Sequence, residues 1–187
     1  MRAGKRRVMV QIPTGGGKTL LAARLIAGAR AKGNRVVFVA PYSTLISQTI
    51  AVFEGEGLGP IGAMQADHPR TIPFAPIQVA TSQTLARRDR PDADLVFVDE
   101  AHRMDEALFD WLNAPEMQAV PVIGLSATPW AKGLGEHYDH LIVGATTASL
   151  IEAGHLSPFR IYARPRPTLP ACAFALATTP RASLPTP

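Results

Sequence analysis

Short apolar runs alternate with stretches of helical periodicity along the chain. The apolar runs that predict strands are residues 8–12, 35–40, 62–65, 77–80, 95–98, 120–125 and, as an edge strand, 159–162. Apolar residues at helical spacing predict helices over residues 18–32, 45–53, 103–113 and 147–153, and another that begins within residues 81–84. Because a strand, helix, strand crossover is right-handed, this alternation predicts an α/β domain with a mainly parallel sheet.

The composition supports one such domain followed by a different kind of segment. Of the 187 residues, 47% are hydrophobic and 18% are charged, which suits a buried sheet and argues against global disorder. Prolines punctuate the alanine-rich end of the chain, so we expect a domain over residues 1–163 and a flexible tail over residues 164–187. The net charge of +4 is compatible with nucleic acid but equally common among proteins that never bind it.

Cysteine usage and hydropathy indicate the compartment. The single cysteine, Cys172, excludes an internal disulfide and any multi-cysteine zinc site, so a reducing, cytoplasmic setting is expected. The basic N-terminus is followed by too short an apolar run for a signal peptide. No apolar stretch reaches the length of a membrane span, so no membrane partner is expected.

Residues 13–19, Pro-Thr-Gly-Gly-Gly-Lys-Thr, lie between the first strand and the first helix and predict a phosphate-binding loop. Glycines let the backbone turn sharply and aim its N–H groups at an anion, and the helix N-terminus favours negative charge. Lys18 supplies a positive charge, and Thr19 places a hydroxyl where it can hold Mg²⁺. The predicted nucleotide-binding residues are Thr14, Gly15, Gly16, Gly17, Lys18 and Thr19.

This loop has the shorter form of the phosphate-binding pattern. The general pattern has a glycine where this chain has Ile12, so the prediction depends on Gly15, Gly17, Lys18 and Thr19. The alternative is a glycine-rich turn that happens to precede Lys and Thr. The strand before the loop and the helix after it favour a site for a nucleoside triphosphate.

The second candidate site follows the strand at residues 95–98, where Asp99, Glu100 and His102 occur. Adjacent carboxylates at the end of a buried strand can divide the work of hydrolysis. Asp99 can hold the Mg²⁺ that bridges the phosphates, and Glu100 can position and deprotonate the attacking water. The alternative is a pair of acids that cap the following helix. Ser126 and Thr128, after a later strand, can hydrogen bond to Asp99 or His102, or be ordinary turn hydroxyls.

Hydroxyl groups begin two of the predicted helices. Ser43 and Thr44 lie at one start and Thr81 and Ser82 at another, where such groups cap the helix or bind a nucleic-acid phosphate. At the end of the second of these helices, Arg87 and Arg88 can lie along a phosphate backbone or satisfy the helix dipole. The residues alone leave both alternatives open.

Together these segments resemble the motifs of superfamily 2 helicases, in the DEAH-type and restriction-subunit-like branch. Residues 13–19, 99–102 and 126–129 are similar to motifs I, II and III, in order and spacing, and residues 40–48 and 80–88 are similar to motifs Ia and Ib. The likeness covers roughly residues 8–163. It implies a RecA-like P-loop NTPase fold, a three-layer sandwich around a mainly parallel sheet.

The resemblance also implies cofactors and roles. ATP and Mg²⁺ are the implied cofactors, with Lys18 on phosphate, Thr19 and Asp99 on Mg²⁺, and Glu100 activating water. His102, Ser126 and Thr128 are implied to couple hydrolysis to nucleic-acid binding. The implied nucleic-acid contacts, with DNA favoured over RNA, are Ser43, Thr44, Thr81, Ser82, Arg87 and Arg88.

Two departures from the family limit this expectation. Seven residues precede the first strand, so the upstream glutamine motif that holds adenine has no counterpart in the chain. After residue 162 the family continues into a second RecA-like lobe with an arginine finger, whereas this chain enters its proline-rich tail. We therefore expect the ATP-binding lobe of a helicase or translocase that needs a second lobe, or a nuclease subunit, as partner. The alternative is a nucleotide- or nucleic-acid-binding module without useful catalysis.

Overall fold

The computed structural model describes residues 5–65, 68–103, 105–160 and 162. The chain divides into two units, Met1–Ser157 and Pro158–Pro187, and every helix and strand described below lies in the first. The predicted tail, residues 164–187, lies outside the described residues, and the domain boundary at residue 163 stays a prediction.

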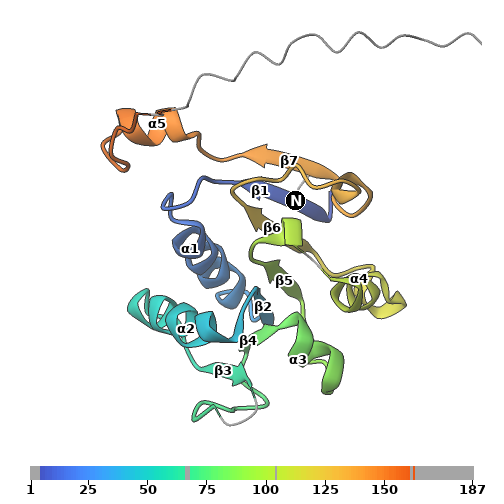
Figure 1. The fold of residues 1–187 in the computed structure, drawn as a ribbon. Helices are drawn as coiled ribbons and strands as arrows, with labels where there is room; N and C mark the ends of the chain where they lie inside the picture. Colours follow the sequence, from blue (N-terminus) through green and yellow to red (C-terminus); the bar gives the residue numbers. More distant parts are fainter. Residues whose placement is uncertain (1–4, 66–67, 104, 161, 163–187) are drawn as a thin grey trace, which may run out of the picture. The chain divides into compact units, whose positions relative to one another are not determined.

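A seven-stranded sheet forms the centre of the described residues, and all of its strand pairs are parallel (Figure 1). Its strands are β1 (Arg7–Gln11), β2 (Val36–Ala40), β3 (Ile61–Met64), β4 (Ile77–Thr81), β5 (Leu95–Val98), β6 (Val122–Ser126) and β7 (His140–Val143). The order across the sheet is β3-β4-β2-β5-β6-β1-β7, so β6 separates β1 from β5. The predicted parallel α/β sheet is confirmed.

Helices cover both faces of this sheet. They are α1 (Lys18–Arg30), α2 (Ile46–Gly55), α3 (Ser82–Arg87), α4 (Glu106–Asn113) and α5 (Thr147–Glu152). Short 3-10 turns occur at Ser43–Leu45, Ala101–Arg103, Pro115–Met117 and Leu134–Glu136. The helix predicted from residue 103 begins later, at Glu106, because Asp105 caps it by accepting a hydrogen bond from the Leu108 N–H at 2.9 Å.

Two hydrophobic clusters show how the layers form. On one face α1 and α2 pack against the sheet, with Ile26 and Phe53 fully buried. On the other face α3 and α4 pack against it, with Leu85 and Trp111 in the core. Since side chains alternate along a strand, the continuous apolar run of β2 supplies both clusters. The predicted three-layer sandwich is confirmed.

The edge of the sheet beside β1 differs from the prediction. Phe159, Arg160 and Tyr162, expected in an edge strand, are in no strand, and that expectation is wrong. The edge position is occupied by β7, whose four residues are all exposed. The Asp139 carboxylate fixes the start of β7 by accepting hydrogen bonds from the N–H groups of Arg6 and Arg7 at 3.0 and 2.9 Å. The apolar run of β7, residues 141–143, is three residues long, shorter than the runs of about four to eight residues from which buried strands are recognised.

No helix in the described ranges is both long and apolar enough to cross a membrane.

The close approach of β3 to the loop after it gives a test of the fold. A Cβ on Gly62 would lie 2.5 Å from the Ile72 carbonyl oxygen and 2.6 Å from the Gln78 Oε1. We expect Gly62→Ala to lower the free energy of unfolding by about 1–3 kcal/mol, because backbone must move. The control is Gly28→Ala in α1, where a Cβ meets nothing within 4 Å and alanine favours the helix. Equal urea midpoints for the two variants would contradict the described packing.

Candidate nucleotide-binding site

The loop between β1 and α1 has the backbone shape that its glycines permit. Gly15 and Gly17 adopt positive φ angles of 77° and 84°, which residues with a side chain rarely adopt. Gly17 is also the N-cap of α1, and no side chain caps that helix. The loop is closed by a hydrogen bond from the Gly16 N–H to the Pro13 carbonyl at 2.9 Å. The uncapped start of α1 thus offers N–H groups for an anion.

Two leucines that sequence reasoning missed lie against this loop. A Cβ on Gly16 would lie 2.7 Å from Ile12 Cγ2 and 2.9 Å from Leu150 Cδ1. A Cβ on Gly15 would lie 3.1 Å from Leu156 Cδ2. The glycines are therefore needed for packing as well as for φ. Nothing in the pattern around residues 150–156 indicates this contact, since a short amphipathic helix looks the same wherever it packs.

An ion pair joins the loop to the carboxylate pair across the sheet. The Lys18 Nζ lies 3.2 Å from the Glu100 Oε1, with the lysine side chain 11% exposed and the glutamate 29%. Glu100 has a φ of 48°, an uncommon value for a residue with a side chain. Sequence reasoning assigned both residues to one site, and the structure brings them into direct contact.

Asp99 directly follows β5 and is partly buried. Its N–H donates to the Val39 carbonyl at 2.9 Å, and its Oδ1 accepts from the Glu100 N–H at 3.0 Å. Burial raises the pKa of the Asp99 carboxyl, and the neighbouring Glu100 carboxylate adds to the rise. The hydrogen bond from Glu100 and the charges of Lys18 and His102 oppose it. A carboxyl group whose pKa is raised by burial in the folded chain is typical of a site that binds a cation.

His102, Ser126 and Thr128 form a connected group beside the ion pair. The fully buried Ser126 Oγ lies 2.9 Å from the His102 Nδ1 and accepts a hydrogen bond from the Thr128 N–H at 3.0 Å. The same His102 nitrogen lies 3.5 Å from the Glu100 Oε2. Of the two partners expected for the Ser126 hydroxyl, the structure shows His102. The group links the end of β6 to Glu100.

A divalent cation fits the donors at this site. No group of three or more His, Cys, Asp and Glu side chains suited to a metal occurs among the described residues. Mg²⁺ does not need such a group, because it is usually held by one or two carboxylates together with substrate phosphates and water. Thr19 at the start of α1 and Asp99 at the end of β5 are the candidate protein ligands.

The predicted nucleic-acid contacts lie in two places, with the hydroxyl residues in one and the arginines in the other. Ser43 and Thr44 follow β2 and are exposed, whereas Thr81 ends β4 and Ser82 follows it, so all four lie at the carboxyl edge of the sheet. The Thr81 Oγ1 caps α3 by accepting from the Thr84 N–H at 3.3 Å, and the Ser82 Oγ donates to Asp105 at 2.5 Å.

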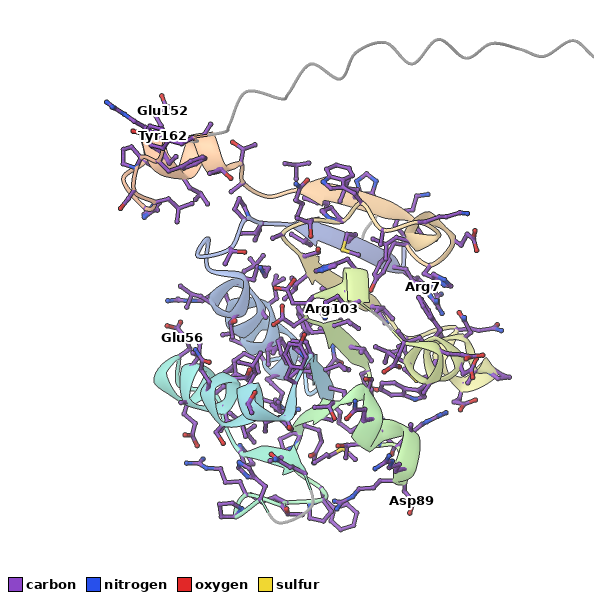
Figure 2. All side chains as sticks on the ribbon, in the orientation of Figure 1. Arg7, Glu56, Asp89, Arg103, Glu152 and Tyr162 are labelled. Atoms are coloured by element: carbon purple, nitrogen blue, oxygen red, sulfur yellow. The ribbon has the colours of Figure 1, made fainter. Side chains whose placement is uncertain are left out.

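Arg87 and Arg88 lie at the other end of α3. They line a cavity with residues that precede β2, β4 and β5, away from the carboxyl edge. Figure 2 shows their neighbour Asp89 well apart from Arg103, which follows the carboxylate pair. The structure therefore separates the arginines from the hydroxyls with which they were grouped.

Sequence reasoning also missed a stacked pair beside the carboxylates. The Arg103 guanidinium lies over the Tyr42 ring, with its Cζ 5.5 Å from the ring centroid. Both residues line a pocket of 190 Å³ together with Ser82, Asp99 and Glu100. Arg103 follows Asp-Glu-Ala-His directly, but the spacing does not indicate that its side chain turns back toward Tyr42.

Comparisons with known proteins agree with this geometry. The model of the family described as type III restriction enzyme, res subunit, matches residues 1–131. A curated relative, the 51.5 kDa protein of Lactococcus phage (isolate 7-9), is 28% identical over 165 residues, which cover 84% of this chain and 32% of that protein. The chain thus spans about a third of that relative's length.

Solved helicase structures share the fold. The UvsW helicase from bacteriophage T4 superposes with a TM-score of 0.64 at 17% identity, over 74% of this chain and 54% of that chain. The Hef helicase domain of Pyrococcus furiosus superposes with a TM-score of 0.59 at 25% identity, over 74% of this chain and 35% of that chain.

The parallel sheet, its loop and its strand order define a helicase-like RecA lobe of superfamily 2. The resemblance seen in the sequence motifs is therefore confirmed. Within that class, the chain belongs to the type III restriction enzyme res subunit family.

The raised pKa of Asp99 predicts a stability effect that depends on pH. Above the folded-state pKa the ionised carboxyl costs stability, and that cost disappears as the pH falls toward the unfolded value of 3.8. We expect Asp99→Asn to be more stable than the parent at pH 7 in urea unfolding, with a difference that shrinks as the pH is lowered.

The control for this prediction is Asp94→Asn. The hydrogen bond from the Arg35 side chain lowers the pKa of Asp94, so its carboxylate stabilises the fold above pH 3.8 and loses that effect as the pH falls through its folded pKa. This variant should be less stable than the parent at pH 7. Shifts of the same sign in the two variants would contradict the assignment for Asp99.

Proposed function

We propose that the chain is the ATP-binding lobe of an ATP-dependent helicase or translocase, and that it hydrolyses ATP with Mg²⁺ to move on nucleic acid. The observation that carries this proposal is the 3.2 Å pair between Lys18 of the loop and Glu100 of the carboxylate pair. It brings together the groups that in-line attack of water on a γ-phosphate requires, a cation for the phosphate and a carboxylate for the water.

In this proposal each residue has one task. The N–H groups at the start of α1 cradle the phosphates, and Lys18 pairs with the β- and γ-oxygens. Thr19 and Asp99 hold Mg²⁺, which supplies neutralisation of the charge that develops during phosphoryl transfer. Glu100 orients the attacking water and accepts its proton.

The Lys18–Glu100 pair also supplies a resting state. While the two side chains are paired, the lysine charge and one carboxylate oxygen are both engaged. A triphosphate competes for Lys18, because a phosphate oxygen carries more charge than a shared carboxylate. Binding of the triphosphate therefore releases the Glu100 carboxylate from Lys18, so that the carboxylate can act on water only when the substrate is present.

Nucleic acid is the proposed track, with DNA favoured over RNA. The proposed contacts are hydroxyls at the carboxyl edge, namely Ser43, Thr44, Thr81 and Ser82. Support comes from the helicase descriptions of the UvsW and Hef structures and from the restriction-enzyme description of the family. The same descriptions, with the partial coverage of those chains, support a second RecA-like lobe or a nuclease subunit as partner.

Two variants test the proposed hydrolysis. Lys18→Ala should weaken ATP binding, whereas Glu100→Gln should bind ATP and turn it over at least about a hundredfold more slowly, the usual scale of a general base. Turnover is measured with and without single-stranded DNA and RNA, and nucleotide binding by fluorescence of a labelled ATP. Lys32→Ala, an exposed charge just beyond α1, is the matched control.

The alternative function is a nucleotide- or nucleic-acid-binding module without useful catalysis. Turnover of the parent chain no faster than that of Glu100→Gln, with ATP still bound, would favour this alternative. If Lys18→Ala binds ATP as well as Lys32→Ala and the parent chain do, the loop is not part of the ATP site.

The Ser126 group generates a test of coupling. Ser126→Ala leaves the Thr128 N–H and the His102 Nδ1 without this buried partner. The link from the end of β6 through His102 to Glu100 is then broken. We expect basal turnover to change little and its stimulation by DNA to fall by about fivefold or more. The control is Ser47→Ala, which removes a serine–histidine contact of 3.1 Å to His68 elsewhere. Equal stimulation in the two variants would contradict the coupling role.

A further inference from the structure

A large hollow in the described residues lies away from the nucleotide site. It measures about 930 Å³, within the range of ligand sites. It is formed by the starts of β2 and β4, the end of β3, the loop of residues 71–76, and the segment of residues 87–92 that follows α3. Because these strands are parallel, their starts lie at the edge of the sheet opposite to the carboxylate pair.

The cavity exists because α3 is too short to cover its strand. Six helical residues span about 9 Å, whereas the five residues of β4 span about 17 Å. Leu85 of α3 packs in the same cluster as Ala80, near the end of β4. Gln78, two residues earlier on the same face, lies beyond the helix, and the loop of residues 71–76 passes there instead.

Gln78 is an unusual residue for the middle of a buried strand. Its side chain is 3% exposed, and its Nε2 donates to the carbonyls of Ile72 at 2.8 Å and Pro73 at 3.0 Å. Its Oε1 is buried and has no hydrogen-bond partner within the described part of the chain. Since all the neighbours of the Nε2 are acceptors, the amide orientation is determined, and Gln78 is one of the residues that line the cavity.

The arginines that line the cavity differ in whether a carboxylate pairs with them. Arg35 is occupied by Asp92 at 2.6 Å and Asp94 at 3.2 Å. Arg87 and Arg88 line the same cavity, and their guanidinium groups form no ion pair or hydrogen bond with any residue that the structure describes. Two guanidinium groups without an internal partner are available to an anion.

An aromatic side chain lines the same cavity as these arginines. Phe74 is 96% exposed, and the neighbouring Ile72 is 45% exposed. A phenylalanine that buries almost nothing contributes little to folding, because its ring stays in water. Exposed aromatic rings next to arginines are the combination by which proteins bind single strands without reading their sequence.

We propose that this cavity binds a nucleotide unit of a single nucleic-acid strand, with its phosphate on Arg87 and Arg88 and its base on the Phe74 ring. The proposal deepens the proposed function, on whose nucleic-acid binding it rests. It places a second contact at the edge of the sheet opposite to the hydroxyls of the carboxyl edge. A free nucleotide carries the same phosphate and base as a nucleotide of a strand. The test must therefore distinguish binding of a free nucleotide from binding of a strand.

The test measures binding of a labelled single-stranded oligonucleotide by fluorescence anisotropy, without ATP. Arg87→Ala/Arg88→Ala should weaken binding about tenfold and reduce the slope of log K against log salt by about 0.7, the contribution of one phosphate contact on a single strand. Phe74→Ala should weaken binding about fivefold or more and leave the salt slope unchanged. The matched control, Arg24→Ala/Lys32→Ala, removes two charges from the α1 side.

A carboxyl-edge variant, Thr44→Ala/Ser82→Ala, separates this inference from the proposed function. Weaker binding in that variant with parent-like binding in the cavity variants would overturn the inference and leave the proposed function standing. No oligonucleotide binding by the parent chain would overturn both. Equal losses in the arginine variant and its charge-matched control would also overturn the inference.

Two further measurements identify the ligand directly. Photocrosslinking of an iodouracil-containing strand should label the peptide that carries Phe74, and a label found elsewhere counts against the cavity. If a nucleoside monophosphate displaces the labelled strand at a concentration near that of the strand's nucleotides, the cavity binds a free nucleotide. If the monophosphate does not displace the strand, the cavity binds a nucleotide of the strand.

Discussion

The Lys18–Glu100 ion pair depends on a distance that the strand order imposes. The two residues follow β1 and β5, and β6 lies between these strands, so the chain ends are about two strand spacings, roughly 10 Å, apart. The Lys18 and Glu100 side chains span that gap together, meeting 3.2 Å apart, and the residue at the end of β6, between β1 and β5, is the small and fully buried Ser126. The order of three strands thus explains why a long cation, a small hydroxyl and a carboxylate occupy these positions.

Much of the site was predictable because its signals are local. The glycines, Lys18 and the acidic pair each follow a buried apolar run, and in a parallel sheet such positions share one edge. The strand order was not predictable, since crossover helices permit several orders with the same local pattern. β7 was missed because its apolar run, residues 141–143, is only three residues long, and Arg87 was grouped with Thr81 because the length of α3 cannot be read from periodicity alone.

The candidate catalytic and coupling residues are also the positions at which the fold loses stability. Asp99 ionises against its burial, and Glu100 holds a left-handed backbone that a side chain disfavours. Ser126 places a hydroxyl in the core, where a partner must be supplied. Each choice is poor for packing and sensible for binding a charged substrate, so the conflict between local preference and observed structure itself indicates the site.

The contact of Leu150 with the phosphate-binding loop bears on how substitutions at that loop are interpreted. Gly16 is enclosed by Ile12 on one side and Leu150 on the other, with less than 3 Å for an added Cβ. In a saturation library selected only for soluble protein, Gly16 would be retained while Thr14, which is exposed, would vary. Invariance at position 16 among homologous chains is then evidence of steric enclosure, and its use as a marker of nucleotide binding needs Lys18 alongside it.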